Sequence, residues 1–484
     1  WYSGSSLNYY YMGQFLASFL TRLSFVKVSV GYNLMLMMVG AFACVLPYSI
    51  VYNVILQFMK DKGKISRYLP PACGFIAGVA VCIAGNMHYP SYKWFEPLVR
   101  KFFGMEKGTY SYWFPDATRF IGYHPETNDK TIHEFPCYSF VLGDLHAHVV
   151  NIMFVLTVVG ILLAWMIWRR KKVGSGLSLA KEVLNPAIIM ISFFIGFFKM
   201  TNYWDFPIYY VVSGAVILFT NIIVYNFKGK AIFVVTAVQG AFVMAVSVLT
   251  SLPFMLSFDK IASNIRLAQS HTALNQLIIL WGLPFFIVFS YISFVLADVF
   301  KKKNSNDAII ENEHNRHGEH ISFIRRIFSE LTPSDLFIIT LGLCAAGLVL
   351  LPELIYVEDI YSGDYKRANT MFKLTYQAFI LFGICIGYIL PRLMAYGNSW
   401  RRIRYSIVSL ILFAMTVCYA QNAVNAWYGN ILIPSGYKGL DATAFMYDVM
   451  PEDMDAINWL NENVTGMPVV LEANGSSYSD YQRI

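Results

Sequence analysis

A carboxylate and two imidazoles lie within five residues of one another, at Asp144, His146 and His148. On a helix, Asp144 and His148 share a face as an i, i+4 pair, whereas His146 points elsewhere. Two roles compete for this group: Asp144 as a general base steered by a histidine, or Asp144 and His148 as ligands of a divalent cation, Mg²⁺ or Mn²⁺. The spacing matches no specific zinc signature. Asp144 also suits the simpler role of a helix N-cap.

Two cations, Arg367 and Lys373, flank the expected start of a long apolar helix, where Asn369 or the next residue would cap the first turn. The free N–H groups of a helix N-terminus and two cations favour an anion, and a lipid phosphate is the anion expected at this depth. The alternative is that the cations form ordinary ion pairs with Glu358 and Asp359, which precede them. Both interpretations stay open, and all five residues are candidates for substrate binding.

Aromatic and hydrogen-bonding side chains gather in two other segments at the ends of apolar runs. They are Tyr9, Tyr10 and Tyr11 in the first segment and Asn202, Trp204 and Asp205 in the second. Rings that carry hydroxyl groups can form a platform under a sugar or a lipid headgroup. The amide and the carboxylate can bond sugar hydroxyls. Equally, the first segment suits an aromatic belt at a membrane interface, and the second suits a helix start.

The composition identifies the elements that must position these groups. Of 484 residues, 56% are hydrophobic and only 14% are charged, against roughly 25% charged in soluble proteins. Disorder and collagen-like structure are excluded, and a polytopic membrane protein fits. The formal net charge of +7, from 37 Lys+Arg and 30 Asp+Glu, therefore does not indicate nucleic-acid binding. The seven cysteines form no CxxC pair and suit buried apolar positions.

The apolar runs predict an all-α polytopic membrane protein with about ten transmembrane helices, because about 20 apolar residues in a helix cross a bilayer. The runs are 30–59, 69–87, 145–168, 185–198, 206–227, 231–257, 272–297, 336–351, 374–390 and 405–420. Their middles lack ionisable side chains, which weakens a transporter interpretation.

Lysine and arginine gather in alternate connections, and the positive-inside rule then orients the chain. The basic connections are 60–67, 169–181, 228–230, 301–326 and 392–404. We therefore expect a multi-pass protein of the cell membrane whose motif-bearing loops, 88–144, 258–271 and 352–370, are external. In this division, residues 1–29 form an external loop and interfacial helix, and residues 30–420 form the transmembrane domain.

The two ends of the sequence suggest a piece of a longer protein that lacks an N-terminal span and most of a C-terminal domain. Residues 421–484 read as the start of an external α/β domain. A helix is expected to begin at Pro451 and to end by Gly466, and a strand is expected over 468–471. One helix and one strand cannot bury a core by themselves.

The joint order of these motifs resembles the YYY-type membrane proteins (Chlor_Arch_YYY) of archaea, Chloroflexi and clostridia. The resemblance covers nearly the whole chain and is carried by segments 1–11, 143–148, 358–373 and 471–479. That family is similar in layout to the GT-C class of glycosyltransferases, which use polyprenyl-phosphate-linked sugars at an external active site. In that class an acidic residue of the first external loop acts as base or metal ligand. Here the sequence would begin inside that loop, at Trp1, and an acid just before Trp1 would lie outside it.

The resemblance implies an integral-membrane glycosyltransferase. Its partners would be membrane lipid, a polyprenyl-phosphate-linked sugar and an external glycan or protein acceptor, with no nucleic acid. Asp144 would act with His146 or His148, while Arg367 and Lys373 would hold the phosphate. The alternatives are a flippase or transporter of lipid-linked glycans, for which a polar path through the helices is expected, and a non-catalytic scaffold of a surface assembly.

Overall fold

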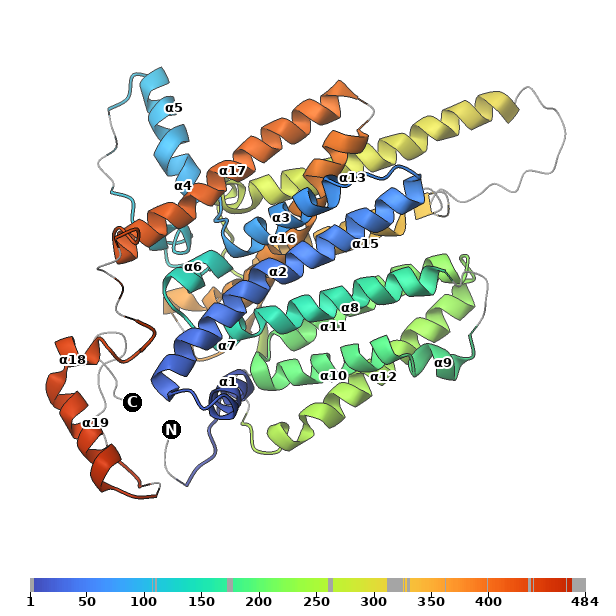
Figure 1. Ribbon diagram of the computed structural model, residues 1–484. Coiled ribbons are helices and arrows are strands. Elements are labelled where there is room, and N and C mark those ends of the chain that lie inside the picture. Colours follow the sequence, from blue (N-terminus) through green and yellow to red (C-terminus); the bar gives the residue numbers. More distant parts are fainter. Residues whose placement is uncertain are drawn as a thin grey trace.

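The structure is a computed structural model in which helices predominate (Figure 1). The residues it describes are 4–106, 108, 111–171, 177–259, 264–310, 325, 327–328, 331–361, 363–397, 399–433, 437, 439–466 and 468–471. Trp1 and residues 472–484, which contribute to the resemblance above, lie outside this part of the chain.

Eight helices in the described part of the chain are long and apolar enough to cross a membrane. Their helical elements are α2 (Val28–Lys62), α8 (Ile152–Arg170), α11 (Asp205–Val224), α12 (Gly229–Met255), α13 (Leu274–Ile310), α15 (Pro333–Leu350), α16 (Ala368–Tyr396) and α17 (Trp400–Tyr428). Two shorter apolar helices are α3 (Leu69–Cys82) and α10 (Pro186–Thr201). These ten helices coincide with the ten predicted apolar runs, so the predicted fold class is confirmed.

The described helical bundle is built around α16, whose apolar face and much of whose circumference are buried. Small residues allow a close approach of α3 to α16: a Cβ atom added to Gly387 would lie 2.5 Å from the Cβ atom of Ala77. A Cβ added to Gly383 would likewise lie 2.7 Å from a methyl group of Val81. Glycine at a helix interface is typical of membrane proteins, where van der Waals packing holds the helices together.

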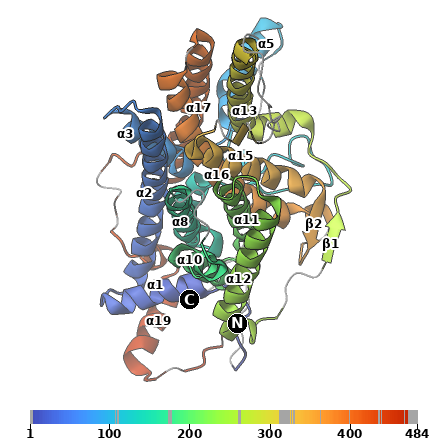
Figure 2. The same ribbon diagram turned by 90° about the vertical axis from the view of Figure 1, so that its right-hand side faces the viewer.

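Short elements gather at one end of the bundle, which we call the α7 end. They are α1 (Met12–Leu23), α4 (His88–Pro90), a π-helical turn (Ser91–Phe95), α5 (Glu96–Phe102), a 3₁₀ turn (Phe114–Ala117), α6 (Pro136–Val141) and α7 (Ala147–Val150). Strands β1 (Asn264–Leu267) and β2 (Ile355–Glu358) form a two-stranded antiparallel sheet that pairs Asn264 with Glu358. The 3₁₀ turns Leu351–Glu353 and Gly363–Tyr365 flank β2. Figure 2 shows α1 lying across the direction of α2, on the side of the molecule away from β1 and β2.

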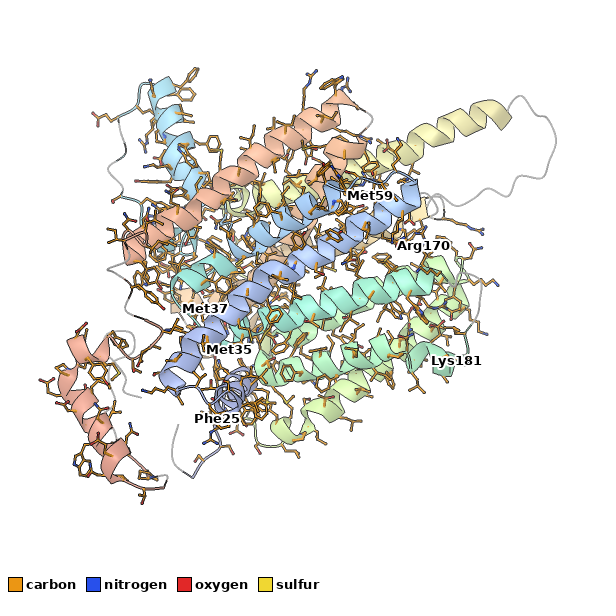
Figure 3. All side chains as sticks on the ribbon, viewed as in Figure 1. Phe25, Met35, Met37, Met59, Arg170 and Lys181 are labelled. Carbon is orange, nitrogen blue, oxygen red and sulfur yellow. The ribbon has the colours of Figure 1, made fainter. Side chains whose placement is uncertain are left out.

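The two ends of the bundle differ in charge. Figure 3 shows Phe25 at the α7 end and Arg170 and Lys181 at the opposite end, where the short helix α9 (Leu179–Val183) lies. Near that opposite end, Arg169 forms a buried ion pair with Glu182. Arg392 likewise pairs with Asp335, with 2.9 Å between Nε and Oδ1. The described residues Arg169, Arg170 and Lys181 of one predicted basic connection thus lie at the end opposite α7, while the orientation of the protein stays a prediction.

The C-terminal part of the described chain contains α18 (Met446–Val449) and α19 (Pro451–Asn463). The helix predicted to begin at Pro451 is therefore confirmed. The strand predicted over 468–471 is wrong, because these residues have no regular structure. A strand needs a partner that takes up its backbone hydrogen bonds, and no strand of the described residues lies in this region.

Candidate functional site

The loop that carries Asp144 begins at Gly143, which has a φ of 67° that glycine adopts without strain. The Oδ1 atom of Asp144 accepts a hydrogen bond from the backbone N–H of His146 at 3.0 Å, and it also contacts the Nδ1 atom of the same ring. The predicted N-cap role of Asp144 is wrong, because His146 occupies the cap position of α7. The expectation that His146 points away from Asp144 is also wrong, since residue 144 precedes the helix and its carboxylate folds back onto residue 146.

Neighbouring helices hold this loop in place. The Nε2 atom of Gln14, in α1, donates to the carbonyl of Leu145 at 3.1 Å. The hydroxyl of Tyr32, in α2, donates to the carbonyl of Gly143 at 2.9 Å. Each bond joins residues more than one hundred positions apart, so the position of Asp144 depends on the packing of the whole bundle.

His148 is buried on the first turn of α7, with 4% of its surface exposed. Its ring contacts Phe372 and Tyr376 of α16 edge to face, with centroids 4.8 Å apart in both cases. The Nε2 atom lies 4.0 Å from Oδ2 of Asp144 and, among the described residues, has no hydrogen-bond partner. His146 is exposed, and its hydrogen bond to Asp144 raises the pKa of its imidazole above the usual value. The two histidines therefore differ: one ring stabilises the Asp144 carboxylate, and the other presents an unused nitrogen.

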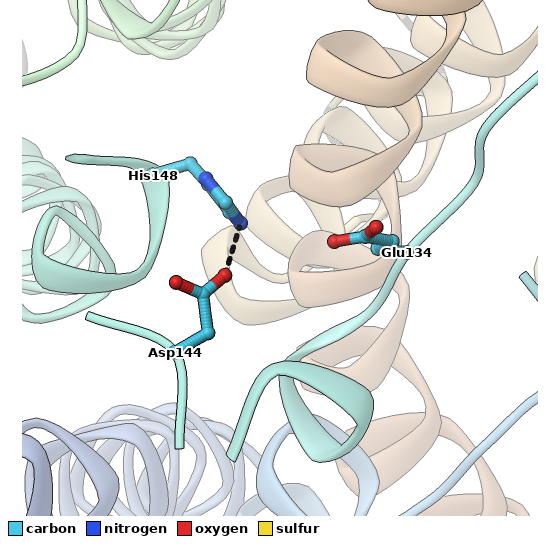
Figure 4. Close-up of side chains that lie close together, drawn as sticks. All are labelled: Glu134, Asp144 and His148. Atoms are coloured by element: carbon cyan, nitrogen blue, oxygen red, sulfur yellow. Dashed lines mark ion pairs between the residues drawn. The ribbon is translucent and has the colours of Figure 1, made fainter. Parts of the chain in front are cut away.

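Glu134 joins Asp144 and His148 in a group of three potential ligands. It precedes α6, and its Oε1 atom accepts from Arg119 at 2.8 Å. Potential ligand atoms of Glu134, Asp144 and His148 all lie within 4.8 Å of one another. Figure 4 shows the Glu134 carboxylate turned toward the other two from the opposite side of the space between them.

Two carboxylates and an imidazole suit a divalent cation that accepts oxygen and nitrogen ligands, such as Mn²⁺ or Mg²⁺. The unpaired Nε2 atom of His148 supports this fit, because a buried polar atom normally has a partner. The predicted pair Asp144 and His148 is brought together in space, and Glu134 is the ligand that the spacing did not indicate.

Lys373 extends the group from α16. Its ammonium lies over the ring of Phe372, 4.5 Å from the centroid. It interacts electrostatically with three carboxylates, those of Asp205, Glu134 and Asp144. Among the described residues it forms no ion pair within 4.0 Å, which leaves its N–H groups able to bind an anion. The same Phe372 ring contacts His148, so Lys373 lies beside the Glu134–Asp144–His148 group.

Asp205 starts α11, as predicted, but it is fully buried. Its Oδ2 atom accepts hydrogen bonds from the amides of Asn151 at 2.5 Å and Asn202 at 2.8 Å. Thr201 donates to Asn151 at 2.8 Å. Asp205 and Asn202 are thus hydrogen-bonded to each other in the interior of the protein. Trp204, at the N-cap position, is half-buried.

The tyrosines of segment 9–11 lie close to the Asp144 loop and to two other loops. Tyr9 and Tyr10 have ring centroids 4.9 Å apart. Burial raises the pKa of Tyr9, and the charge of Asp144 raises it further. Burial raises the pKa of Tyr10 to about 12, with further contributions from Tyr9 and Asp359. Tyr11 instead contacts Phe254 of α12, at 5.6 Å between centroids. Tyr9 therefore lies within electrostatic range of Asp144, and Tyr10 lies within that of Asp359.

The other residues predicted around the start of α16 have partners of their own. The buried guanidinium of Arg367 donates to Asp129 at 2.6 Å and pairs with Glu353 at 3.0 Å. Asn369 donates to Asp359 at 2.6 Å. The predicted cap by Asn369 or the next residue is wrong, because Arg367 is at the cap position of α16 and no side chain caps it.

Glu358 pairs with Arg266 across the β1–β2 sheet, at 3.1 Å, and this pairing holds its pKa below the usual value. Of the cations that were predicted to hold phosphate, Lys373 faces the Asp144 group, whereas Arg367 is neutralised by two carboxylates. The substrate-binding roles of Arg367, Asn369, Glu358 and Asp359 stay predictions.

The residues that sequence reasoning missed carry weak local signals. Glu134 follows a histidine and precedes an apolar helix start, and Arg119 lies 15 positions earlier. Asn151 stands in an otherwise apolar run, which is the clearest of the three signals because buried amides need partners. The pairing of Glu134 with Asp144 could not be read from spacing, since it depends on where α6 places the preceding loop.

Comparison with known proteins gives one match. A protein-family model described as "Uncharacterized membrane protein (DUF2298)" matches residues 1–321 and 320–382. No curated protein and no solved structure matches the chain.

Proposed function

Because the chain belongs to the DUF2298 family of uncharacterized membrane proteins, whose description assigns no activity, we propose a function from the site itself. The proposal is an integral-membrane glycosyltransferase. It transfers a sugar from a polyprenyl-phosphate donor to a glycan or protein acceptor, at the membrane face on which α7 lies.

The observation that carries this proposal is the proximity of Lys373 to Glu134, Asp144 and His148. A polyprenyl phosphate leaves as an anion, so it needs positive charge more than it needs a general acid. Lys373 offers such a charge at the end of a membrane-crossing helix, where the phosphate of a membrane-embedded lipid would lie. A divalent cation held by Glu134, Asp144 and His148 would neutralise more of the phosphate charge.

The two oxygens of Asp144 suggest a division of roles. Oδ1 is engaged by His146, through both its backbone N–H and its ring. Oδ2 faces His148 at 4.0 Å, and it is the oxygen that can take a proton from an acceptor hydroxyl or bind a cation. His146 is a positioning residue in either case, since it orients the carboxylate.

The sugar would lie against Tyr9 and Tyr10, whose rings are tilted against each other with centroids 4.9 Å apart, within electrostatic range of Asp144. Aromatic rings with hydroxyl groups suit the apolar face and polar edge of a sugar. Asp205 and Asn202 lie in the interior, and in this proposal they support Lys373 electrostatically instead of bonding sugar hydroxyls. Arg367 has no part in it, because its charge is already paired.

The test is release of polyprenyl phosphate. Purified protein in nanodiscs is incubated with a panel of polyprenyl-phosphate hexoses, labelled in the sugar, and with soluble glycan and peptide acceptors. We expect Asp144→Asn to lower the rate at least about 100-fold, since a positioned base or a bound cation contributes that much. Glu126→Gln is the matched control, because Glu126 is a carboxylate of the segment before α6 and pairs with Lys130 on the surface.

Chelation by EDTA assigns the role of Oδ2. A rate that falls on chelation and returns with Mn²⁺ assigns it to a cation site, whereas an unchanged rate assigns it to the base. The absence of release with every donor, or equal rates in Asp144→Asn and the parent protein, would overturn the proposal. Movement of a labelled lipid-linked sugar between leaflets of proteoliposomes, without release of polyprenyl phosphate, would replace it with a flippase.

A further inference from the structure

A helical arm leaves the bundle after α3. It comprises α4, the π-helical turn and α5, and Figure 1 shows α5 standing away from the bundle and crosswise to the long helices. The base of the arm is fixed by aromatic contacts, with the ring of Tyr89 lying 5.7 Å from Trp94 and 5.1 Å from Tyr112. Tyr89 also belongs to a buried cluster with Tyr419 of the membrane-crossing helix α17. The base of the arm therefore packs against the membrane-crossing helix α17.

The arm exposes a continuous apolar face. Phe95, Leu98, Val99 and Phe102 recur at the i, i+3, i+4, i+7 spacing of one helix face, and Phe102 is 85% exposed. Phe103 is 70% exposed and extends this face past the end of α5. Isolated apolar side chains on a surface are common, but a contiguous face of this kind marks a contact with another apolar phase.

The opposite face of the arm is basic. Lys93 and Arg100, seven positions apart, share that face, and Lys101 adjoins it. Arg100 is held by Glu96, at 2.8 Å, and by the carbonyl of Glu106, at 3.2 Å. The three cations border a hollow of about 560 Å³ between the arm and the returning chain. Lys93 and Lys101 supply positive charge to this hollow beyond the paired Arg100.

We propose that residues 91–105 form an interfacial arm that lies in the leaflet at the α7 end, with its apolar face among acyl chains and Lys93 and Lys101 on anionic phospholipid headgroups. An amphipathic helix with aromatic and aliphatic residues on one face and cations on the other binds in this way. The position of the arm supports lipid over a protein partner, because it leaves the bundle sideways, beside helices that themselves contact lipid. Figure 2, viewed from the opposite end of the long helices, shows α5 projecting beyond α13 and α17.

Photo-crosslinking tests the arm and does not depend on the proposed enzymatic activity. The full chain with p-benzoylphenylalanine in place of Phe102 is reconstituted in nanodiscs of phosphatidylcholine alone or of an equimolar mixture with phosphatidylglycerol. The matched control carries the same group in place of Trp459, an aromatic residue of α19 that is 59% exposed. We expect lipid adducts at position 102 in both nanodiscs and no comparable adducts at position 459.

The charges are tested by the double variant Lys93→Gln and Lys101→Gln. It should lower the ratio of phosphatidylglycerol to phosphatidylcholine adducts at least about fivefold, since each cation near an anionic surface contributes about that factor. Persisting adducts with phosphatidylcholine show that the arm of the variant is still in place. Equal adducts at positions 102 and 459, a protein–protein adduct at 102, or an unchanged lipid ratio in the variant would overturn the proposal.

Discussion

The Nε2 atom of His148 lies 4.0 Å from the Oδ2 atom of Asp144. This separation is too long for a hydrogen bond. It suits two ligands of one cation, because ligand bonds of about 2.1 Å place neighbouring ligand atoms about 3 to 4 Å apart. Glu134 approaches the same space from a different segment, so three parts of the chain would be joined by one ion.

We therefore predict that the protein binds one Mn²⁺ at this group and that Glu134→Gln weakens binding at least about tenfold, the loss expected even for less direct partners of a metal site. Isothermal titration of the detergent-purified, metal-stripped protein measures the affinity. Glu126→Gln, in the same loop, should leave it unchanged. Equal affinities in the Glu134→Gln variant and the parent would exclude Glu134 as a ligand.

The effects of replacing Lys373 and Arg367 can be compared, because both residues were expected to hold phosphate. Among the described residues, Arg367 is paired with carboxylates and Lys373 is not. Lys373→Gln should lower kcat/KM for the polyprenyl-phosphate donor about 100-fold, since loss of a buried charge contact costs about 3 kcal/mol. Lys366→Gln, an exposed lysine of the same segment, should change it by no more than about twofold. A similar loss in both variants would indicate a general effect of charge.

Arg367→Gln is expected to act on stability. The change leaves Asp129 and Glu353 uncompensated in a partly buried position, which costs about 3 kcal/mol of unfolding free energy. Thermal unfolding in detergent should show a lower midpoint, whereas Arg266→Gln, an exposed partner of Glu358, should have little effect. A raised donor KM at unchanged stability would instead support the phosphate role that the sequence suggested.

The features predicted correctly from the sequence depend on nearby residues. The ten apolar helices and the helix starts at Asp205 and Pro451 follow from composition and local capping rules. The proximity of Asp144 and His148 was predicted from a four-residue spacing on a helix, but Asp144 precedes α7 and approaches His148 from the loop. The partners of Arg367 could not be found in this way, because Asp129 lies 238 positions away. Asn369 failed as a cap for a different reason, because Asp359, only ten positions away, offers its amide a charged acceptor.

The buried His88 side chain is expected to make the stability of the protein depend on pH. Its ring is 6% exposed and packs against Phe120, with centroids 4.5 Å apart. Burial and, to a smaller extent, the nearby His124 together lower the pKa of His88 to about 4 from a usual value of 6.5. Between these two values the unfolded chain binds a proton that the folded chain does not. The neutral His88 side chain therefore makes its full contribution to the stability of the folded protein above about pH 6.5. This contribution is lost as the pH falls toward 4.

At about pH 5 the loss amounts to about 2 kcal/mol, since each unit of pKa difference is worth about 1.4 kcal/mol. His88→Phe keeps an aromatic ring at this position and removes the titration. We expect the midpoint of thermal unfolding to fall less between about pH 7.5 and pH 5 in this variant than in the parent protein. His271→Gln, which removes an exposed histidine, should follow the parent. An equal fall in all three proteins would mean that other groups cause the acid sensitivity and that protonation of His88 is not coupled to unfolding.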